Sequence, residues 1–404
     1  MKARWVTKRI GDVAKTQYGL SEPMNEDGKG FRIFRMGEVQ DGRLIDTGRM
    51  KFANITAKEF EPYRLRRGDV LFNRTNSFEL VGKTGIFQLE GDYCFASYLV
   101  RLNLDRHVVL PEFLNYLMNT DAFQESVKGK ASKSINQANI NATILSNEVI
   151  RFPESLPEQQ RIVGVLDEAF AGLATAKAKA ERNLQNARAL FESHLQSVFT
   201  RRGEGWVEMS LQRATGGIFT GPFGSLLHKH DYIENGIPLV NPAHITDTGV
   251  EPDFRKTVSE KTAKRLQSYI MRDGDVVIGR RGEMGRCALI TSTEDGWLCG
   301  TGSFFIKSSP RCDMGFLVRY LRSKSCKQRL EQIAGGAVMP NLSNTSLGEL
   351  IISLPPVEEQ KRIVMELDAL AAETQRLAGL YERKLAALEE LKKSLLHRAF
   401  SGQL

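Results

Sequence analysis

The chain has 404 residues and a net charge of +8, with 41% hydrophobic and 26% charged residues, so it can bury more than one core and has an ordinary globular composition. It contains no apolar run of membrane-spanning length, its start (MKARWVTKRI) lacks the apolar core of a signal peptide, and its five cysteines form no CxxC pair. We therefore expect a cytoplasmic protein without membrane spans, disulfides or structural zinc.

Four segments that differ in charge follow one another along the chain. Residues 1–153 carry 23 Lys and Arg against 18 Asp and Glu, and residues 201–355 carry 20 against 16. Residues 154–200 (5 against 6) and 356–404 (8 against 8) are close to neutral. A basic segment suits a polyanion such as nucleic acid, although an ordinary basic protein has the same balance.

The second half of the chain repeats the first. PEQQRIVGVLD begins at Pro157 and EEQKRIVMELD begins at Glu358, an offset of 201 residues. The same offset relates residues near the two ends of each half, Trp5 with Trp206 and Phe199 with Phe400. A repeat of this length is too long for a solenoid unit and indicates a duplicated globular domain with the element that follows it.

Both basic segments are predicted to be mixed α/β domains, because short apolar runs in them are broken by Gly, Asn and Asp. The predicted strands lie in FRIFRMGEV (31–39), DVLFNR (69–74) and GKTGIFQL (82–89), and again in GIPLVNPAHI (236–245), DVVIGR (275–280) and GRCALI (285–290). One short helix is expected around residues 111–128 and another around 314–333.

Both neutral segments are predicted to be long helices, since each follows a proline, begins with acids and contains no later proline. A helix of roughly 40 residues spans about 60 Å. Apolar residues recur at coiled-coil spacing, in the second helix at Ile363, Leu367, Leu370, Thr374, Leu377, Tyr381, Leu388, Leu391 and Leu395, and in the first at Leu166, Leu173, Ala176, Ala180, Ala187 and Leu190. The two stripes predict that the helices pack on each other, although each could pack on its own domain instead.

The usual catalytic signatures are missing. There is no GxxxxGK[ST] phosphate loop, and NPAH (241–244) shares only its first two residues with the Asn-Pro-Pro-aromatic motif of adenine methyltransferases. PDF (252–254) is not followed by the Glu-x-Lys pair of a nuclease, and the six histidines lack metal-ligand spacing. We expect no catalytic residues, metal or cofactor in this chain.

Two similar basic domains joined by paired helices suit DNA with two short half-sites at a fixed gap. The elements occur in the order domain, LPEQQRIVGVLD and helix, domain, LPPVEEQKRIVMELD and helix, accompanied by GDVLFNR, FTGPFGSLL (219–227) and the closing LLHRAFSGQL. This pattern resembles, over essentially the whole chain, the specificity subunit of type I restriction–modification systems.

The resemblance implies an α+β protein with pseudo-twofold symmetry. Residues 1–153 and 201–355 would be target recognition domains, each reading one half of a bipartite, asymmetric double-stranded DNA target. Residues 154–200 and 356–404 would be spacer helices in an antiparallel coiled coil that docks two methyltransferase subunits, joined by restriction subunits. S-adenosylmethionine, ATP and magnesium would bind to those partners and not to this chain.

The DNA-contact candidates come from chemistry, because Arg, Lys, Asn and Gln in Gly-rich loops can reach base edges and phosphates. In the first domain they are Arg74, Asn76 and Lys83 in NRTNSFELVGK, and Lys130, Lys133, Asn136 and Gln137 in GKASKSINQ. In the second they are Arg280, Arg281 and Arg286 in GRRGEMGR. Each could equally be a solvated surface charge.

Two other functions stay open. The chain could be a self-contained DNA methyltransferase or nuclease with an unrecognised active site, in which case the purified chain alone would carry out chemistry. It could also be a scaffold that spaces protein partners, in which case it would show no sequence-dependent affinity for DNA.

Overall fold

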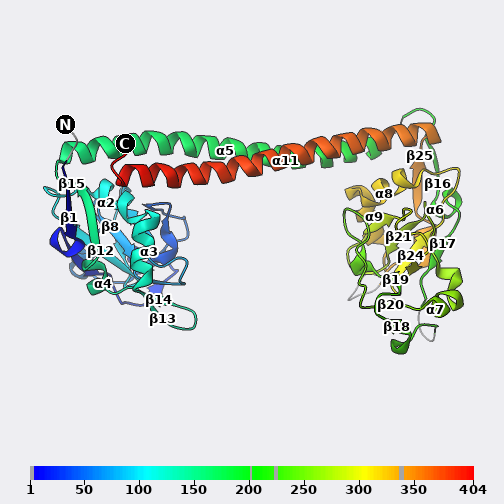
Figure 1. Ribbon diagram of the computed structural model, residues 1–404, viewed down its shortest axis with the longest axis horizontal. Coiled ribbons are helices and arrows are strands. Elements are labelled where there is room, and N and C mark those ends of the chain that lie inside the picture. The colour runs from blue at the N-terminus through cyan, green and yellow to red at the C-terminus, as the bar shows by residue number, and fades with distance from the viewer. Residues whose placement is uncertain (1–3, 201–202, 223–225, 336–340) are drawn as a thin grey trace. The chain divides into compact units, whose positions relative to one another are not determined.

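The computed structural model describes residues 4–200, 203–222, 226–335 and 341–404, so residues 223–225 of the FTGPFGSLL motif lie outside the described part. The chain divides into two units, Met1–Glu181 with Arg383–Leu404, and Arg182–Glu382. Each unit contains one basic segment and part of two long helices, α5 (Leu156–Thr200) and α11 (Val357–Phe400) (Figure 1). No described helix is both long and apolar enough to cross a bilayer.

The first unit is a mixed α/β domain. Its strands are β1 (Trp5–Arg9), β2 (Ala14–Tyr18), β3 (Met24–Asn25), β4 (Phe31–Phe34), β5 (Val39–Gln40), β6 (Arg43–Leu44), β7 (Lys51–Ala53), β8 (Val70–Asn73), β9 (Thr75–Asn76), β10 (Thr84–Ile86), β11 (Tyr93–Phe95), β12 (Leu99–Leu104), β13 (Ser132–Lys133), β14 (Ala138–Asn139) and β15 (Val149–Pro153). Its short helices are α1 (Ala57–Phe60), α2 (Pro111–Met118), α3 (Asp121–Gly129) and α4 (Ala142–Ser146).

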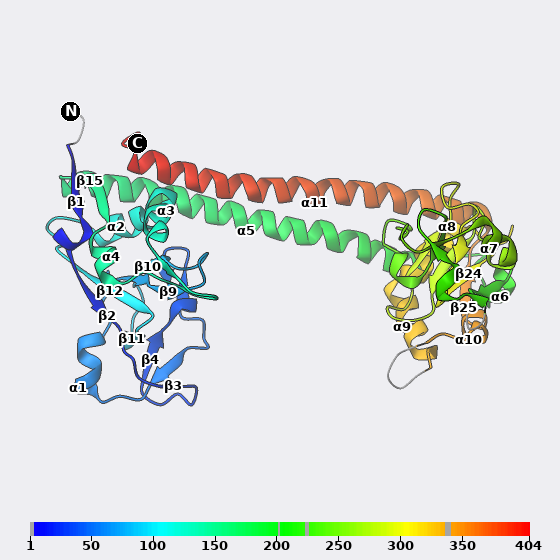
Figure 2. The same ribbon diagram turned by 60° about the horizontal axis from the view of Figure 1, so that its bottom comes forward.

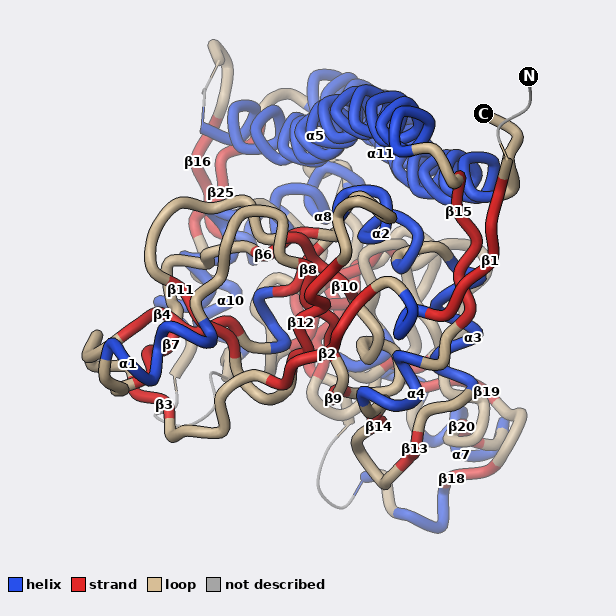
Figure 3. Tube along the Cα trace, turned by 90° about the vertical axis from the view of Figure 1, so that its left-hand side faces the viewer, coloured by secondary structure: helices blue, strands red, loops and turns tan. Residues whose placement is uncertain are grey.

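The main sheet of the first unit has the order β2-β12-β8-β10-β6-β5, and a second sheet has the order β11-β4-β7-β3. Strand β8 lies at the centre of the main sheet and is buried along its whole length, as its apolar sequence predicts. Seen from the side of this unit, α2 lies between the main sheet and the α5–α11 pair (Figure 3).

The second unit repeats this architecture. Its strands are β16 (Val207–Ser210), β17 (Ile218–Thr220), β18 (Tyr232–Ile233), β19 (Ile237–Val240), β20 (Thr257–Val258), β21 (Val276–Gly279), β22 (Cys287–Leu289), β23 (Leu298–Cys299), β24 (Ser303–Ile306) and β25 (Ile351–Leu354), and its short helices are α6 (Leu211–Ala214), α7 (Glu260–Arg265), α8 (Met314–Arg322), α9 (Lys324–Ile333) and α10 (Asn344–Gly348). The sheet orders β17-β24-β21-β22 and β18-β20-β19-β23 match those of β2-β12-β8-β10 and β3-β7-β4-β11 in sequence position. The predicted domain duplication is therefore confirmed.

The predicted strands are confirmed within their ranges, but the prediction of one helix in each of two ranges is wrong. Residues 111–128 form most of α2 and α3, and residues 314–333 form α8 and α9. The break has the same cause in both units. The hydroxyls of Thr120 and Ser323 accept hydrogen bonds from the backbone amides of Phe123 and Cys326, so each residue caps a new helix.

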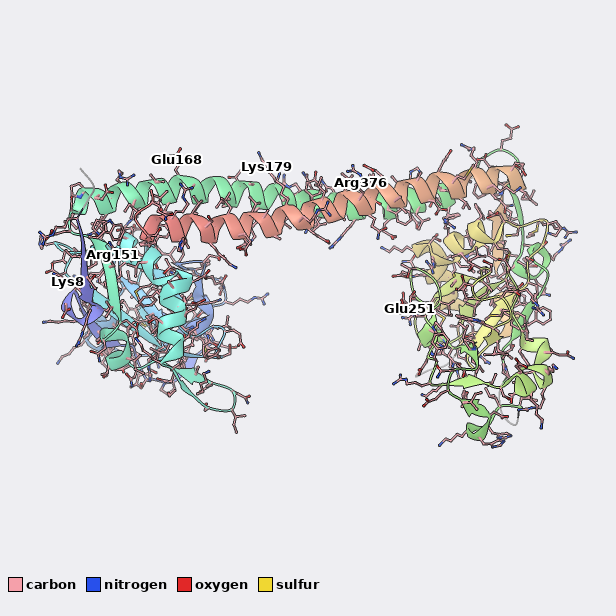
Figure 4. The ribbon with its side chains drawn as sticks, viewed as in Figure 1. Lys8, Arg151, Glu168, Lys179, Glu251 and Arg376 are labelled. Carbon is pink, nitrogen blue, oxygen red and sulfur yellow. The ribbon has the colours of Figure 1, made fainter. Side chains whose placement is uncertain are left out.

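Within each unit, α5 and α11 run antiparallel, side by side (Figures 1 and 2). In the first unit Lys177 pairs with Glu389 at 2.7 Å, and in the second Arg188 pairs with Glu382 at 2.7 Å. The small side chains of Ala180 and Ala187 are buried, as the small-residue stripe predicts. Exposed charges such as Glu168 and Lys179 point away from the pair (Figure 4).

The predicted stripe fails at one repeated position. Leu190 and Leu391, which are related by the 201-residue offset, are 51% and 48% exposed. A straight helix of 3.6 residues per turn drifts away from a strict seven-residue repeat, which carries these leucines off the contact face.

The repeated PEQQ and EEQ stretches fix each helix to its domain. Gln159 and Gln360 are fully buried, and each side-chain amide bonds three backbone groups of its own unit. Gln159 accepts from the amide of Leu110 at 2.9 Å and donates to the carbonyl oxygens of Val108 and Pro153 at 3.0 and 2.9 Å. Gln360 accepts from Asp313 at 2.7 Å and donates to Arg311 and Pro355 at 3.2 and 2.8 Å.

Aromatic contacts complete these attachments in matching fashion. In the first unit, Phe113 on α2 packs against Trp5 and against Phe400 at the end of α11. In the second, Phe316 on α8 packs against Trp206 and against Phe199 at the end of α5. Each domain therefore holds the start of one long helix and the end of the other, which explains why these residues recur at the same offset.

Two further repeated pairs lie at the attachments. Arg161 and Arg362 form ion pairs with Glu158 and Glu359 on their own helices. Asp167 accepts a hydrogen bond from Tyr116 on α2, and Asp368 pairs with Arg319 on α8, so these aspartates tie each long helix to its domain.

Candidate nucleic-acid interface

The structure brings together two stretches of the first unit that contain predicted DNA contacts. Strand β14 pairs on one side with β13 and on the other with β9, which makes a small three-stranded sheet. Asn76 therefore lies opposite Ala138, which in turn lies opposite Lys133. The β13–β14 hairpin projects from the side of this unit opposite α5 and α11 (Figures 1 and 3).

The tip of this hairpin carries two of the candidates. The backbone amide of Ser134 donates to the carbonyl oxygen of Gln137 at 2.8 Å, which closes a turn with Ile135 and Asn136 at its centre. Asn136 and Gln137 are exposed, and Ile135 is 101% exposed. Polar side chains at such a tip are free to reach a partner.

Three lysines of the first unit have different surroundings. Lys133 is exposed and its ammonium lies 4.0 Å from the centroid of the Phe78 ring. Lys83 is exposed and lies close to Lys128. Partial burial of Lys128, and then the positive charge of Lys83, lower the pKa of Lys128. Lys130 lies 2.6 Å from the carboxylate of Glu148, which is buried, so neutralising that carboxylate accounts for Lys130 without DNA.

Arg74 and Arg280 occupy equivalent half-buried positions. Arg74 donates to the side-chain oxygen of Asn139 at 3.3 Å, and Arg280 donates to that of Asn341 at 3.1 Å. Each guanidinium also lies over an aromatic ring, 4.9 Å from Tyr18 in one case and 5.4 Å from Phe304 in the other. This Arg–Asn clamp joins the end of β8 or β21 to the segment that precedes α4 or α10.

The clamp is reinforced by matching backbone hydrogen bonds. The amide of Ile140 donates to the carbonyl oxygen of Arg74 at 2.8 Å, and that of Leu342 donates to Arg280 at 2.9 Å. Burial and the neighbouring Arg281 lower the pKa of Arg280. The clamps therefore hold the base of the β13–β14 hairpin to the end of β8, and Asn341 and Leu342 to the end of β21.

The other candidates of the second unit lie around the turn between β21 and β22. Arg281 is exposed, and its backbone bridges to Asn341. Arg286 donates to Glu283 at 2.9 Å, so the positive charge of Arg286 is partly neutralised. Glu283 also pairs with Lys327 at 3.0 Å. The segment that corresponds to the tip of the hairpin, residues 336–340, lies outside the described residues.

Sequence reasoning missed several residues of this surface. Lys128, Phe78 and Ile135 lie beside or on the hairpin, and Asn139 and Asn341 form the clamps. The repeat itself contained a signal for the clamps. The arginine ends GDVLFNR in the first half and GDVVIGR in the second, and the asparagine begins the later triplets Asn-Ile-Asn and Asn-Leu-Ser in the same order. The described residues contain no group of three His, Cys, Asp or Glu side chains that could hold a metal ion.

The family model described as type I restriction modification DNA specificity domain matches residues 2–183 and 215–383. The chain belongs to this family. Relatives in this family are specificity subunits, and this chain is accordingly the sequence-specific DNA-binding subunit of a type I restriction–modification system. It has the two recognition domains and the long helices of that fold.

Individual relatives of the specificity-subunit family agree with this assignment. The putative type I restriction enzyme MjaX specificity subunit of Methanocaldococcus jannaschii is 26% identical over 418 residues, which cover 99% of this chain and 93% of that protein. A solved structure titled as the basis of complex assembly and conformational transition of the type I R-M system matches the fold with a TM-score of 0.74, at 19% identity and full coverage of both chains. The HsdS subunit from Thermoanaerobacter tengcongensis matches with a TM-score of 0.63, at 20% identity over 99% of this chain and 97% of that one.

Proposed function

We propose that each unit of this specificity subunit reads one half of an asymmetric, bipartite DNA target, the first through its β13–β14–β9 surface and the second through the loops around β21 and β22. The duplication carries this proposal, because two copies of one framework present different side chains at equivalent places. In the first unit the contacts would be Arg74, Asn76, Lys83, Lys130, Lys133, Asn136 and Gln137, and in the second Arg280, Arg281 and Arg286.

Charge supports DNA as the partner of the hairpin. Residues 126–147, which include the hairpin, contain three lysines and no Asp or Glu. A protein surface that neutralises phosphates gains affinity from released counterions, so lysines on the hairpin suit it, although the charge of Lys130 is already matched by Glu148. Arg74 and Arg280 are held by Asn139 and Asn341, so the contacts proposed for them would be made from fixed positions at the base of the loops.

The helices are proposed to dock two methyltransferase subunits, with restriction subunits joining them. Two equivalent docking sites would follow from the duplication, because each unit presents its two helices in the same way, with Leu190 and Leu391 at the same repeat position. We propose that S-adenosylmethionine, ATP and magnesium bind to these partners, that this chain performs no chemistry, and that the assembly works in the cytoplasm. Methyl transfer or DNA cleavage by the purified chain alone would contradict the proposal.

The test is to express the chain with its methyltransferase subunit in a host without DNA methylation and to map modified bases across the genome. A split motif, with two short specified blocks around a fixed unspecified gap, is the expected result. A single undivided motif would contradict the proposal. If no base is modified, selection of bound duplexes from a random pool distinguishes a mismatched partner from a chain that does not recognise DNA.

A second arm of the test assigns the half-sites. Replacing residues 1–153 by the equivalent domain of a relative should change one block of the motif and leave the other block and the gap unchanged. A change in both blocks would show that the units do not read independently.

A further inference from the structure

We propose that Ile135, at the tip of the β13–β14 hairpin, contacts the 5-methyl group of a thymine in the major groove of the half-site that the first unit reads. This inference rests on the proposed function and goes further, because it names the base contact. It also predicts that this half-site contains at least one A·T pair.

The exposure of Ile135 is the starting observation. Single apolar side chains on a protein surface are common and need no explanation by themselves. Ile135 differs from the other exposed apolar residues described, whose largest exposure is the 65% of Met365, because its side chain is 101% exposed and so touches almost nothing of its own chain. Its position at the tip therefore contributes nothing to folding through burial.

Local backbone preference does not explain the residue either. The hairpin turn has Ile135 and Asn136 between strands that pair Lys133 with Ala138. The loop between the paired strands is therefore residues 134–137, and neither Ile135 nor Asn136 has a positive φ, so its backbone accepts an isoleucine but does not call for one. A large apolar residue that neither packs nor is required by its loop is expected where a partner uses it.

The shape and chemistry of the hairpin select the major groove. A two-stranded antiparallel ribbon fits into the major groove of B-DNA, which is about 12 Å wide. The thymine methyl is the apolar group that base edges present there, and Asn or Gln side chains pair with the adjacent edge of adenine. Ile135 is followed directly by Asn136 and Gln137, so one turn carries an apolar contact and two side chains suited to adenine.

The base of the hairpin holds this tip in place. The Arg74–Asn139 clamp and the pairing of β14 with β9 fix one strand, while the Lys133 ammonium stacks on Phe78 beside the other. Lys133 supplies positive charge two residues before the tip, and the sequence has no acid between residues 126 and 147. A fixed ribbon with a cationic base can enter a groove without losing much conformational freedom.

The experiment is a cycle of substitutions in protein and DNA. The full chain in complex with its methyltransferase subunit binds duplexes that carry the mapped target, in which each thymine of the first unit's half-site is replaced singly by deoxyuridine, which lacks the methyl group. The wild type should bind one of these duplexes about four-fold more weakly, the factor that burial of one methyl group provides. Ile135→Ala should bind the unmodified target more weakly and should no longer distinguish thymine from uracil at that position.

The control and the opposing outcomes are direct. Ile351, an exposed isoleucine of the second unit, provides the matched substitution Ile351→Ala, which should keep the wild-type response to uracil. The inference is overturned if Ile135→Ala responds to uracil as the wild type does, or if the half-site contains no thymine. The proposed function fails separately, if the wild-type complex shows no sequence preference at all.

Discussion

Replacing Gln159 by Ala should destabilise the first unit and leave the second unchanged. The Gln159 side chain is fully buried and makes three hydrogen bonds to the backbone, at 2.9, 3.0 and 2.9 Å. Its removal leaves the amide of Leu110 and the carbonyl oxygens of Val108 and Pro153 without their partner. Each unpaired buried group costs about 1–3 kcal/mol, and water that enters the vacated space offsets part of this cost.

The expected loss is therefore about 2–4 kcal/mol of unfolding free energy for the first unit. For a unit of this size, 1 kcal/mol corresponds to roughly 2–4 °C in Tm, so the midpoint should fall by roughly 4–16 °C. Because two units need not unfold together, a single global transition is a poor measure. Amide hydrogen exchange followed by segment is better, since it reports the loss of protection in α2, β15 and the start of α5 separately from the second unit.

The chain offers matched controls for this experiment. Gln160 is the next residue on the same helix and is exposed, so Gln160→Ala changes the same chemical group without removing a buried partner. Gln360→Ala is the equivalent substitution in the other unit and should weaken protection in α8, β25 and the start of α11 only. If Gln159→Ala matches Gln160→Ala within about 0.5 kcal/mol, or if protection falls equally in both units, the buried glutamine does not fix the helix to the domain.

Three further predictions concern the helices, a tyrosine and the thiols. Inserting four residues within 170–195, together with four in the facing part of α11, lengthens the helix pair by about 6 Å. The unspecified gap of the methylation motif should then grow by about two base pairs. Altered half-sites would show that the helices do not act as a spacer. Burial and then Asp167 raise the pKa of Tyr116, so the contribution of Tyr116 to stability is present below about pH 10 and is lost as the pH rises above that value. Tyr116→Phe should remove this pH dependence and should also remove one late-titrating tyrosine from an ultraviolet absorbance titration. An unchanged titration would refute the assignment. Burial raises the pKa of all five cysteine thiols, that of Cys287 to about 11. An aromatic disulfide reagent near neutral pH should therefore label no thiol in the folded protein and five thiols in denaturant. Rapid labelling without denaturant would contradict this prediction.

The parts of this fold that sequence predicted are those with a local or repeated signal. Apolar spacing indicated both long helices, and the 201-residue repeat indicated the duplicated domain. The breaks at Thr120 and Ser323 were missed because an N-cap hydroxyl inside a helical stretch has no periodicity of its own. Gln159 was missed for a different reason, since a polar residue in the first turn of a helix usually faces solvent, and only the packed domain shows that it is buried.

The candidate interface was predictable in composition but not in arrangement. NRTNSFELVGK and GKASKSINQ were each recognisable as polar loops with cations, yet their meeting in one sheet depends on the pairing of β14 with β9, residues more than sixty positions apart. Propensity cannot determine such a long-range pairing. It also cannot show that Lys130 faces a buried carboxylate while Lys133 faces an aromatic ring.

The two copies agree where they build the frame and differ where they would meet DNA. The clamps Arg74–Asn139 and Arg280–Asn341 match in geometry, as do the attachments of both long helices. The sequence that leads into each clamp does not match, since KASKSINQA precedes Asn139 and GGAVMP precedes Asn341. One is cationic and amide-rich and the other is apolar without a charge. Because base recognition depends on side-chain chemistry, we expect the two halves of the proposed target to differ in sequence.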